Sequence, residues 1–192
     1  INNLTAGIAG SGTTIIYAAT SGGVYQSVAG GEWGLIQGDL QERNIQAIAV
    51  GVGALYVGIS NGVYKGTEAA GSWQWTEIND GLPPSRSVRT LQTYCPISGA
   101  CTIYAGLSGG PYKRIEGSTT SWAGLPSAGL TNSDIQSVAV APTTPSPTVF
   151  AGTQSGMFRI TDDDVPSRSW TLTNNMQDLS GLVVNRGNWI LS

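Results

Sequence analysis

The stretch "IYAATSGGVYQS" (residues 16–27) places two short apolar runs, each with a tyrosine, on either side of a Gly-Gly pair. Nearly the same pattern returns in "LYVGISNGVYKG" (55–66), "IYAGLSGGPYKR" (103–114) and "VFAGTQSGMFRI" (149–160). Apolar alternation around Gly, Asn or Ser is typical of two strands joined by a tight hairpin turn. The sequence therefore predicts four copies of one β-hairpin.

Other aromatic residues and a further apolar run extend each copy. The first aromatic residue of the hairpin recurs about every 45 residues. A second aromatic residue follows within the same hairpin, and a tryptophan comes after it. The three sets are Tyr17, Tyr56, Tyr104 and Phe150; Tyr25, Tyr64, Tyr112 and Phe158; and Trp33, Trp75, Trp122 and Trp170. Apolar alternations such as "IQAIAV" and "IQSVAV" precede the hairpins, so each copy is interpreted as four short strands.

Repeats of this length with four strands each indicate the blades of a β-propeller. A sheet with two apolar faces cannot bury either face alone, so each blade needs a neighbour. Small residues after the first tyrosine, such as Gly58 and Gly106, are expected where an adjacent blade packs closely. We predict one all-β domain, with blades at 4–36, 45–78, 88–123 and 135–172 and a half blade at 179–192.

Four blades and half of a fifth do not make an ordinary closed ring. The chain is a fragment of a longer propeller, or another chain supplies the missing strands, or the half blade pairs with the first copy in a small ring. We favour the fragment. An open end exposes an apolar blade face to water, which predicts oligomerisation or aggregation of the isolated chain.

The composition narrows the classes of function. With 11% charged residues, a net charge of −3 and scattered arginines, the chain lacks the basic surface of a nucleic-acid binder. It contains no histidine, which removes the commonest general base and metal ligand. No run approaches the length of a membrane-spanning helix. "TDDDV" (161–165) lacks the spacing of an EF-hand and is expected to cap a turn, and we expect no cofactor and no metal.

Two short features indicate an oxidising compartment. Cys95 and Cys101 enclose "PISGA" between two β-like runs, which predicts a disulfide at the mouth of a hairpin, with two free thiols as the alternative. Asn3 begins "NLT", a candidate for N-glycosylation. We therefore expect a secreted or cell-surface protein.

The stretch "GGVYQSVAGGEWGLIQGDL" resembles the Asp-box, or BNR-like, propeller repeat. Its family pattern is a Gly-Val-aromatic strand followed by Ser-x-Asp-x-Gly-x-Thr-Trp and a Gly-Leu turn. Ser27, Gly30, Gly31 and Trp33 match it, whereas Ala29 stands at the aspartate position.

The fourth copy, "FRITDDDVPSRSWTL", keeps an acid at the box position, Asp163, before Trp170. The resemblance covers essentially the whole chain and implies a propeller fold. In this family the box is a structural turn, in which the aspartate caps backbone amides and the tryptophan packs beneath. Sialidases, xyloglucan-active glycoside hydrolases, sortilin-type receptors and photosystem II assembly factors carry such repeats.

Ligands of propellers usually bind the face formed by the inter-blade loops and by the turns between second and third strands. The candidates on this face are Glu42, Arg43, Asn44, Arg86, Asn132, Asp134 and Asp178. Arginines there, including Arg89, either converge on a channel or form ion pairs with Glu42, Asp134 or Asp178. Trp73 and Trp189 fall outside the repeating pattern, so they are the aromatic residues most suited to ligand contact.

These observations favour a scaffold or recognition module without catalysis of its own. Its partner is a protein or a glycan, another chain that completes the ring, or a second copy of itself. The alternative is the propeller portion of a secreted carbohydrate-active enzyme of the glycoside hydrolase kind. Such enzymes need two carboxylates across a cleft. Asp134 and Asp178 occupy equivalent loops but match no catalytic motif, so we assign no catalytic residue.

Overall fold

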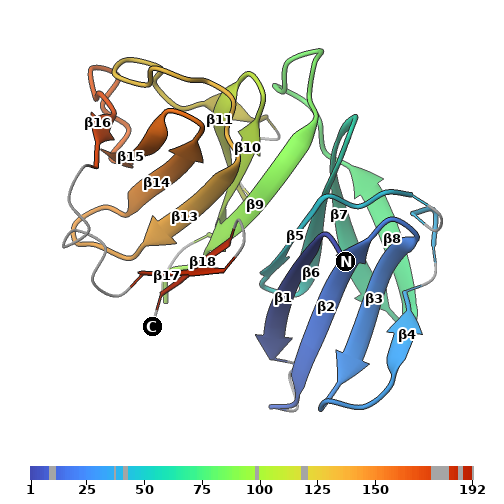
Figure 1. Ribbon diagram of the computed structural model, residues 1–192. Helices are drawn as coiled ribbons and strands as arrows, with labels where there is room; N and C mark the ends of the chain where they lie inside the picture. Colours follow the sequence, from blue (N-terminus) through green and yellow to red (C-terminus); the bar gives the residue numbers. More distant parts are fainter. Residues whose placement is uncertain are drawn as a thin grey trace.

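The computed structural model describes residues 1–8, 12–36, 38–40, 43–97, 100–117 and 121–173, together with the strands at 182–185 and 188–191. These residues form strands and the turns and loops between them (Figure 1). Four antiparallel sheets follow one another along the chain, and in each sheet every strand pairs with the next one in sequence. We number these sheets as the first to the fourth blade.

The strand bounds are as follows. The first blade contains β1 (Asn3–Ile8), β2 (Thr14–Thr20), β3 (Gly23–Val28) and β4 (Trp33–Leu35). The second contains β5 (Ala47–Gly51), β6 (Ala54–Ile59), β7 (Gly62–Ala69) and β8 (Ser72–Glu77). The third contains β9 (Val88–Tyr94), β10 (Thr102–Leu107), β11 (Gly110–Ile115) and β12 (Ala123–Gly124). The fourth contains β13 (Ser137–Ala141), β14 (Thr148–Thr153), β15 (Gly156–Thr161) and β16 (Thr171–Leu172), and a hairpin of β17 (Leu182–Asn185) and β18 (Asn188–Leu191) follows.

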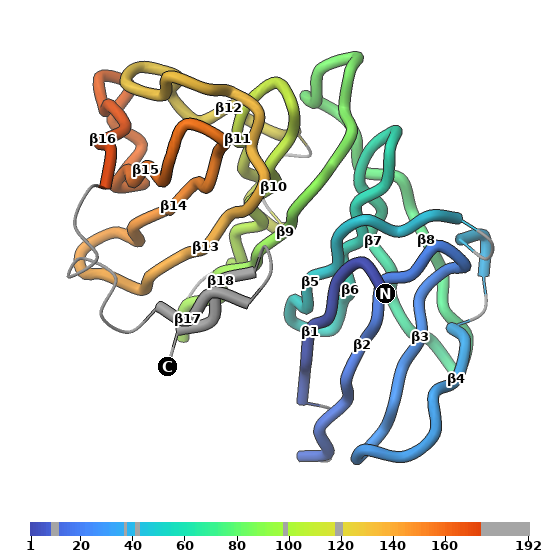
Figure 2. The backbone as a smooth tube through the Cα atoms, in the orientation of Figure 1, coloured from blue at the N-terminus to red at the C-terminus, as the bar shows by residue number. Residues whose placement is uncertain are grey.

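The first strands of the four blades form the inside of the assembly. β1 contacts β5, β5 contacts β9, and β9 contacts β13. Figure 2 shows β4 and β16 on opposite outer sides of the molecule, with β5 and β9 between them. Consecutive meander sheets that meet through their inner strands are the architecture of a partial β-propeller, as the repeats predict.

The hydrophobic core lies between the blades. Three clusters of buried side chains each combine residues of two successive blades. We call the side of a blade that meets the previous blade its leading face and the other side its trailing face.

Two glycines allow neighbouring blades to approach closely. A Cβ atom added at Gly58 would lie 2.5 Å from Cγ1 of Val88, and one at Gly106 would lie 2.6 Å from Cγ2 of Ile135. The expected close packing at these two glycines is therefore confirmed.

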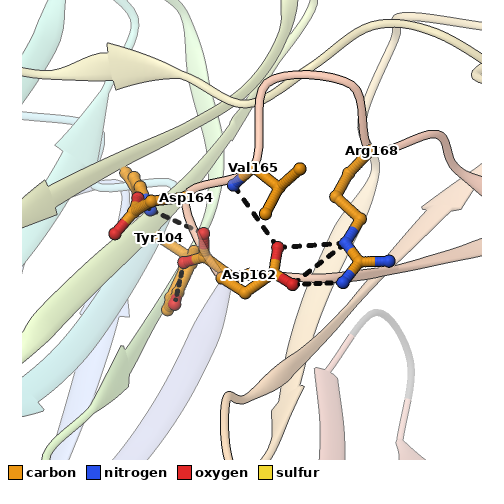
Figure 3. A network of polar contacts seen from close by, with 7 residues as sticks. Tyr104, Asp162, Asp164, Val165 and Arg168 are labelled. Carbon is orange, nitrogen blue, oxygen red and sulfur yellow. Dashed lines mark hydrogen bonds and ion pairs between the residues drawn. The ribbon is translucent and has the colours of Figure 1, made fainter.

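A buried ion pair joins the third and fourth blades (Figure 3). Nζ of Lys113 donates to Oδ1 of Asp162 at 2.5 Å, and the Tyr104 hydroxyl donates to Oδ2 of the same carboxylate at 2.6 Å. The side chains of Lys113 and Asp162 are 14% and 7% exposed. At the junction of the second and third blades, Nζ of Lys65 donates to Oε1 of Glu116 at 2.5 Å. We call this repeated lysine–carboxylate pair the junction clamp.

The clamp lysines occupy equivalent positions. Lys65 lies opposite Tyr56 and Lys113 opposite Tyr104 in the β-ladder. The same cross-strand position holds Gln26, opposite Tyr17, in the first blade. The chain therefore repeats the clamp at the last two described junctions and replaces its lysine by a neutral side chain at the first.

The outer tryptophan of a blade packs on the Gly-Leu turn of the preceding blade. Nε1 of Trp122 donates to the Ile78 carbonyl at 2.5 Å, and Nε1 of Trp170 donates to the Pro126 carbonyl at 2.6 Å. Both tryptophans are 3% exposed, whereas Trp33 is 48% exposed. Recurrence of the four tryptophans at equivalent positions predicts that all of them pack in a core. This prediction is wrong for Trp33, because no described blade precedes the first blade.

The predicted disulfide is confirmed. Cys95 and Cys101 are bonded, and they close the β9–β10 hairpin at the end of β9. The bond stabilises mainly by restricting the unfolded chain, and a loop this short contributes about 2 kcal/mol in the chain-entropy picture.

Substituting Gly81 by Ala should disrupt the junction between the second and third blades. Gly81 has φ of +85°, and a Cβ atom there would lie 2.3 Å from the Trp122 carbonyl oxygen. Gly53 is the matched control, since its φ is +65° but no atom lies within 4 Å of an added Cβ. Gly53→Ala should cost about 1–2 kcal/mol from the left-handed backbone alone. Gly81→Ala should cost about 2 kcal/mol more in urea denaturation, because the turn or the tryptophan must move. Equal losses in the two variants would contradict this packing.

The clamp also predicts how stability depends on alkaline pH. Burial, and then the hydrogen bond to Asp162, raises the pKa of Tyr104 above its ordinary value of 10.0. Unfolded Tyr104 loses its proton near pH 10 while the folded residue keeps it, so its contribution is complete below pH 10 and is lost as the pH rises further. One such group lowers the free energy of unfolding by up to about 1.4 kcal/mol per pH unit. Urea denaturation between pH 9 and about pH 11.5 should show a shallower decline in Tyr104→Phe than in the wild type. Parallel declines would exclude this role.

Candidate functional site

The loops that lead into the inner strands lie over the turns between second and third strands. Nε of Arg86 donates to the Asn61 carbonyl at 2.6 Å, and Asn61 belongs to the turn between β6 and β7. Nδ2 of Asn132 lies 3.4 Å from Oγ of Ser155, in the turn between β14 and β15. We call the surface that these loops and turns form the entry face.

A row of polar contacts crosses the entry face from blade to blade. At the first junction, Nδ2 of Asn2 donates to Oδ1 of Asn44 at 2.9 Å. At the second, the Ser87 hydroxyl donates to Oε1 of Gln46 at 3.3 Å. At the third, Nη2 of Arg89 lies 3.2 Å from Oδ1 of Asp134, an ion pair without hydrogen-bond geometry. In each case a residue at the start of one inner strand meets the loop that enters the next, so the contacts repeat with the blades.

Asp134 is the most constrained carboxylate of the entry face. Its Oδ2 accepts a hydrogen bond from Nε2 of Gln136 at 2.8 Å, and its backbone N–H donates to Oδ1 of Asn132 at 2.8 Å. The side chains of Arg89 and Asp134 are 39% and 29% exposed. An ion pair with this exposure contributes about 0–1 kcal/mol. Both carboxylate oxygens therefore already interact with side chains of the third and fourth blades.

The sequence-predicted candidates are spread over several junctions. Asn132 and Asp134 lie together, while Arg86 lies over the turn of the second blade and also 3.8 Å from Glu77. Cζ of Arg43 lies 6.0 Å from the centre of the Tyr64 ring. Asn44 contacts Asn2, and Glu42 and Asp178 lie outside the described residues. As a binding set these residues stay a prediction.

Several residues of these contacts are not among the candidates that the sequence predicts for this face, namely Asn2, Gln46, Ser87 and Gln136. Arg89 is predicted only as one of several loop arginines. All five stand immediately before or at the start of an inner strand. Aligning the residues that precede each inner strand supplies the signal that would have found them.

Trp73 lies away from the entry face, between the first and second blades. Its ring stacks on Trp75 with centroids 5.8 Å apart and meets Tyr17 edge to face at 6.4 Å. Trp189 is paired with Val184 in the backbone ladder of β17 and β18. Asn3 lies in β1 with a buried Oδ1 that has no hydrogen-bond partner among the described residues. The proposed roles of Trp189 and Asn3 stay predictions.

Two classes of feature are absent from the described ranges. No helix there is long and apolar enough to cross a membrane. No group of three or more His, Cys, Asp or Glu side chains in those ranges is arranged to hold a metal ion.

Comparison with known proteins supports the fold. No family model matches the chain, and no curated protein matches it in sequence. The structure is similar to the extracellular domain of a proposed one-component system from B. thetaiotaomicron, with 18% identity and a TM-score of 0.61 over 88% of this chain and 21% of that one. It is also similar to an ancestral GH74 enzyme, with 16% identity and a TM-score of 0.64 over 92% of this chain and 28% of that one. The chain thus spans less than a third of either neighbour, and the predicted partial β-propeller fold is confirmed.

Proposed function

We propose that the chain is an extracytoplasmic propeller module that works by binding a partner and has no catalysis of its own. The observation that carries this proposal is the pairing of the entry-face side chains with one another across the blade junctions. Asp134, the described candidate for a catalytic carboxylate, is held by Arg89 and Gln136. A general acid or nucleophile must instead face its substrate. The polar row is better suited to joining blades.

The partner that best fits the first blade is another propeller blade. Leu4 is 49% exposed, whereas its equivalents Ile48 and Leu91 are 2% and 4% exposed. Ile1 is 82% exposed, and its equivalent Ile45 is fully buried. Trp33 is exposed as well, so three positions that elsewhere pack on a preceding blade are open together. A blade with a Gly-Leu turn and an apolar trailing face would cover them, supplied by a longer chain or by a second copy.

The location and the family are part of the proposal. The Cys95–Cys101 disulfide supports an oxidising compartment, and one structural neighbour is an extracellular domain. The turn at Asp163 supports an Asp-box origin of the repeats, because its carboxylate lies 3.4 Å from the Val165 backbone N–H. In such a box the aspartate caps the turn, as the resemblance implies.

The alternative is the propeller portion of a carbohydrate-active enzyme. The structural similarity to an ancestral GH74 enzyme supports this alternative. On this alternative, part of the catalytic machinery lies in chain that the present sequence does not include, and the entry face contributes to substrate binding.

Leu4→Lys should weaken self-association of the chain. In the isolated chain, we expect the exposed leading face of the first blade to bind the apolar trailing face of a second copy, and this self-association should have a dissociation constant of about 1–100 μM. Placing an ammonium on this face desolvates a charge on association and should raise the constant about tenfold or more. Val52→Lys is the control, because Val52 is 76% exposed in the turn after β5, away from the leading face. Analytical ultracentrifugation measures both variants, and a wild-type monomer at about 100 μM would exclude this partner mode.

The chain should not hydrolyse a panel of xyloglucan oligosaccharides and sialosides. The reason is that the carboxylate of Asp134 is engaged by Arg89 and Gln136. Product analysis by mass spectrometry is the measurement, with Asp134→Asn as the matched variant. Turnover that disappears in Asp134→Asn would overturn the proposal and establish the enzyme alternative.

A further inference from the structure

The junction between the first and second blades departs from the other two in three ways. Gln26 stands where the later junctions have Lys65 and Lys113, while Glu68 keeps the position of the clamp carboxylate. Nε1 of Trp75 is buried and has no hydrogen-bond acceptor among the described residues. At the other two junctions the equivalent indole N–H donates to a backbone carbonyl.

The third departure is a longer outer hairpin in the second blade. β7 has 8 residues and β8 has 6, whereas the outer strands β12 and β16 have 2 each. The hairpin turns at Ala70 and Gly71, both with positive φ. The extension carries Trp73 opposite Glu68 in the ladder. The outer strands of the other blades pair over fewer residues in the described ranges.

These departures surround one cleft of about 470 Å³ between the first and second blades. Gln26, Leu35, Ile36 and Gly38 line it from the first blade and the loop after it, and Glu68, Gly71, Ser72, Trp73 and Gln74 line it from the second. The volume lies within the range of about 300–1,000 Å³ that is usual for small-molecule sites. The unpaired indole N–H of Trp75 lies next to its wall, because a Cβ atom at Gly38 would be 3.1 Å from that Nε1.

We propose that this cleft binds a neutral saccharide, resting on the recognition role proposed above and assigning it a second site. The lining combines one indole ring with hydrogen-bonding groups from Gln26, Gln74 and Glu68. A sugar ring has an apolar C–H face that packs on an indole and a rim of hydroxyls that pair with amides and carboxylates. Trp73 is held in place by Trp75, which stacks on its ring, and by Tyr17 in an edge-to-face contact, so the platform is pre-organised.

The charges of the lining exclude other ligand classes. No Lys or Arg is among the lining residues of the cleft, so an anionic sugar or a phosphate would meet Glu68 without a compensating cation. A quaternary ammonium ligand needs several aromatic faces around its charge, and here one ring lines the cleft beside neutral amides. The neutral amides and the single ring favour an uncharged polyol.

The test is calorimetric titration of the whole chain with three neutral hexasaccharides, cellohexaose, maltohexaose and mannohexaose. A hexagalacturonate and choline serve as charged probes. At least one neutral hexasaccharide should bind with a dissociation constant of about 0.1–1 mM. Trp73→Ala should weaken this binding about tenfold or more, since it removes the platform. Val52→Ala is the control, because Val52 is 76% exposed in the turn after β5 and is not among the lining residues, and it should change binding less than about twofold.

Gln26→Lys separates loss of the site from loss of the fold. It restores the lysine of the other two junctions, which should pair with Glu68, fill the cleft and abolish binding without lowering the denaturation midpoint. Absence of neutral-sugar binding up to about 10 mM would overturn the assignment. It would equally be overturned by tighter binding of hexagalacturonate or choline, or by unchanged binding in Trp73→Ala. None of these results affects the association through Leu4 or the absence of hydrolysis, so failure of the saccharide site is distinguishable from failure of the proposed function.

Discussion

The packing of one blade against the next is the constraint on which this structure depends. Each sheet is apolar on both faces, and its side chains reach a water-free environment only in a junction. At the second and third junctions the same three contacts recur, namely aliphatic residues of the inner strand, a tryptophan over a Gly-Leu turn, and the junction clamp. The nearly buried pair of Lys113 and Asp162 fixes the third junction strongly, since removing one partner would leave the other charge without compensation.

The repeat made the fold predictable. The hairpins, the disulfide and the close approach at Gly58 and Gly106 all follow from local patterns, because turn residues and small residues restrict the backbone wherever they occur. Exposure was harder to predict. Trp33 occupies the same position in the repeat as Trp122, yet its environment depends on whether a preceding blade is present. That information is not local, so no pattern around Trp33 contains it.

The candidate site was only partly predictable for a similar reason. Asn132 and Asp134 lie together because they are two residues apart in one loop. Which arginine contacts Asp134 depends instead on how the third blade lies against the fourth. The clamp left a signal that an alignment of the copies reveals, since Lys65 and Lys113 follow their tyrosines at the same distance. Gln26, read alone, is an ordinary polar residue of a strand. Gln26 becomes informative only when it is aligned with the lysines at the same position of the later copies. The other differences from the repeat lie at the same junction, between the first and second blades.

The clamp also restricts the covalent chemistry of the chain. The sequence contains two lysines, and both side-chain amines are engaged with carboxylates of the following blade. A protonated amine in an ion pair is a poor nucleophile, because its lone pair is occupied and the reagent must first separate the pair. Acylating reagents, amine-reactive cross-linkers and conjugating enzymes would therefore find few accessible lysines here. Acylation of either lysine would remove the positive charge of a junction clamp. Labelling would therefore weaken the contact between the two blades that the clamp joins.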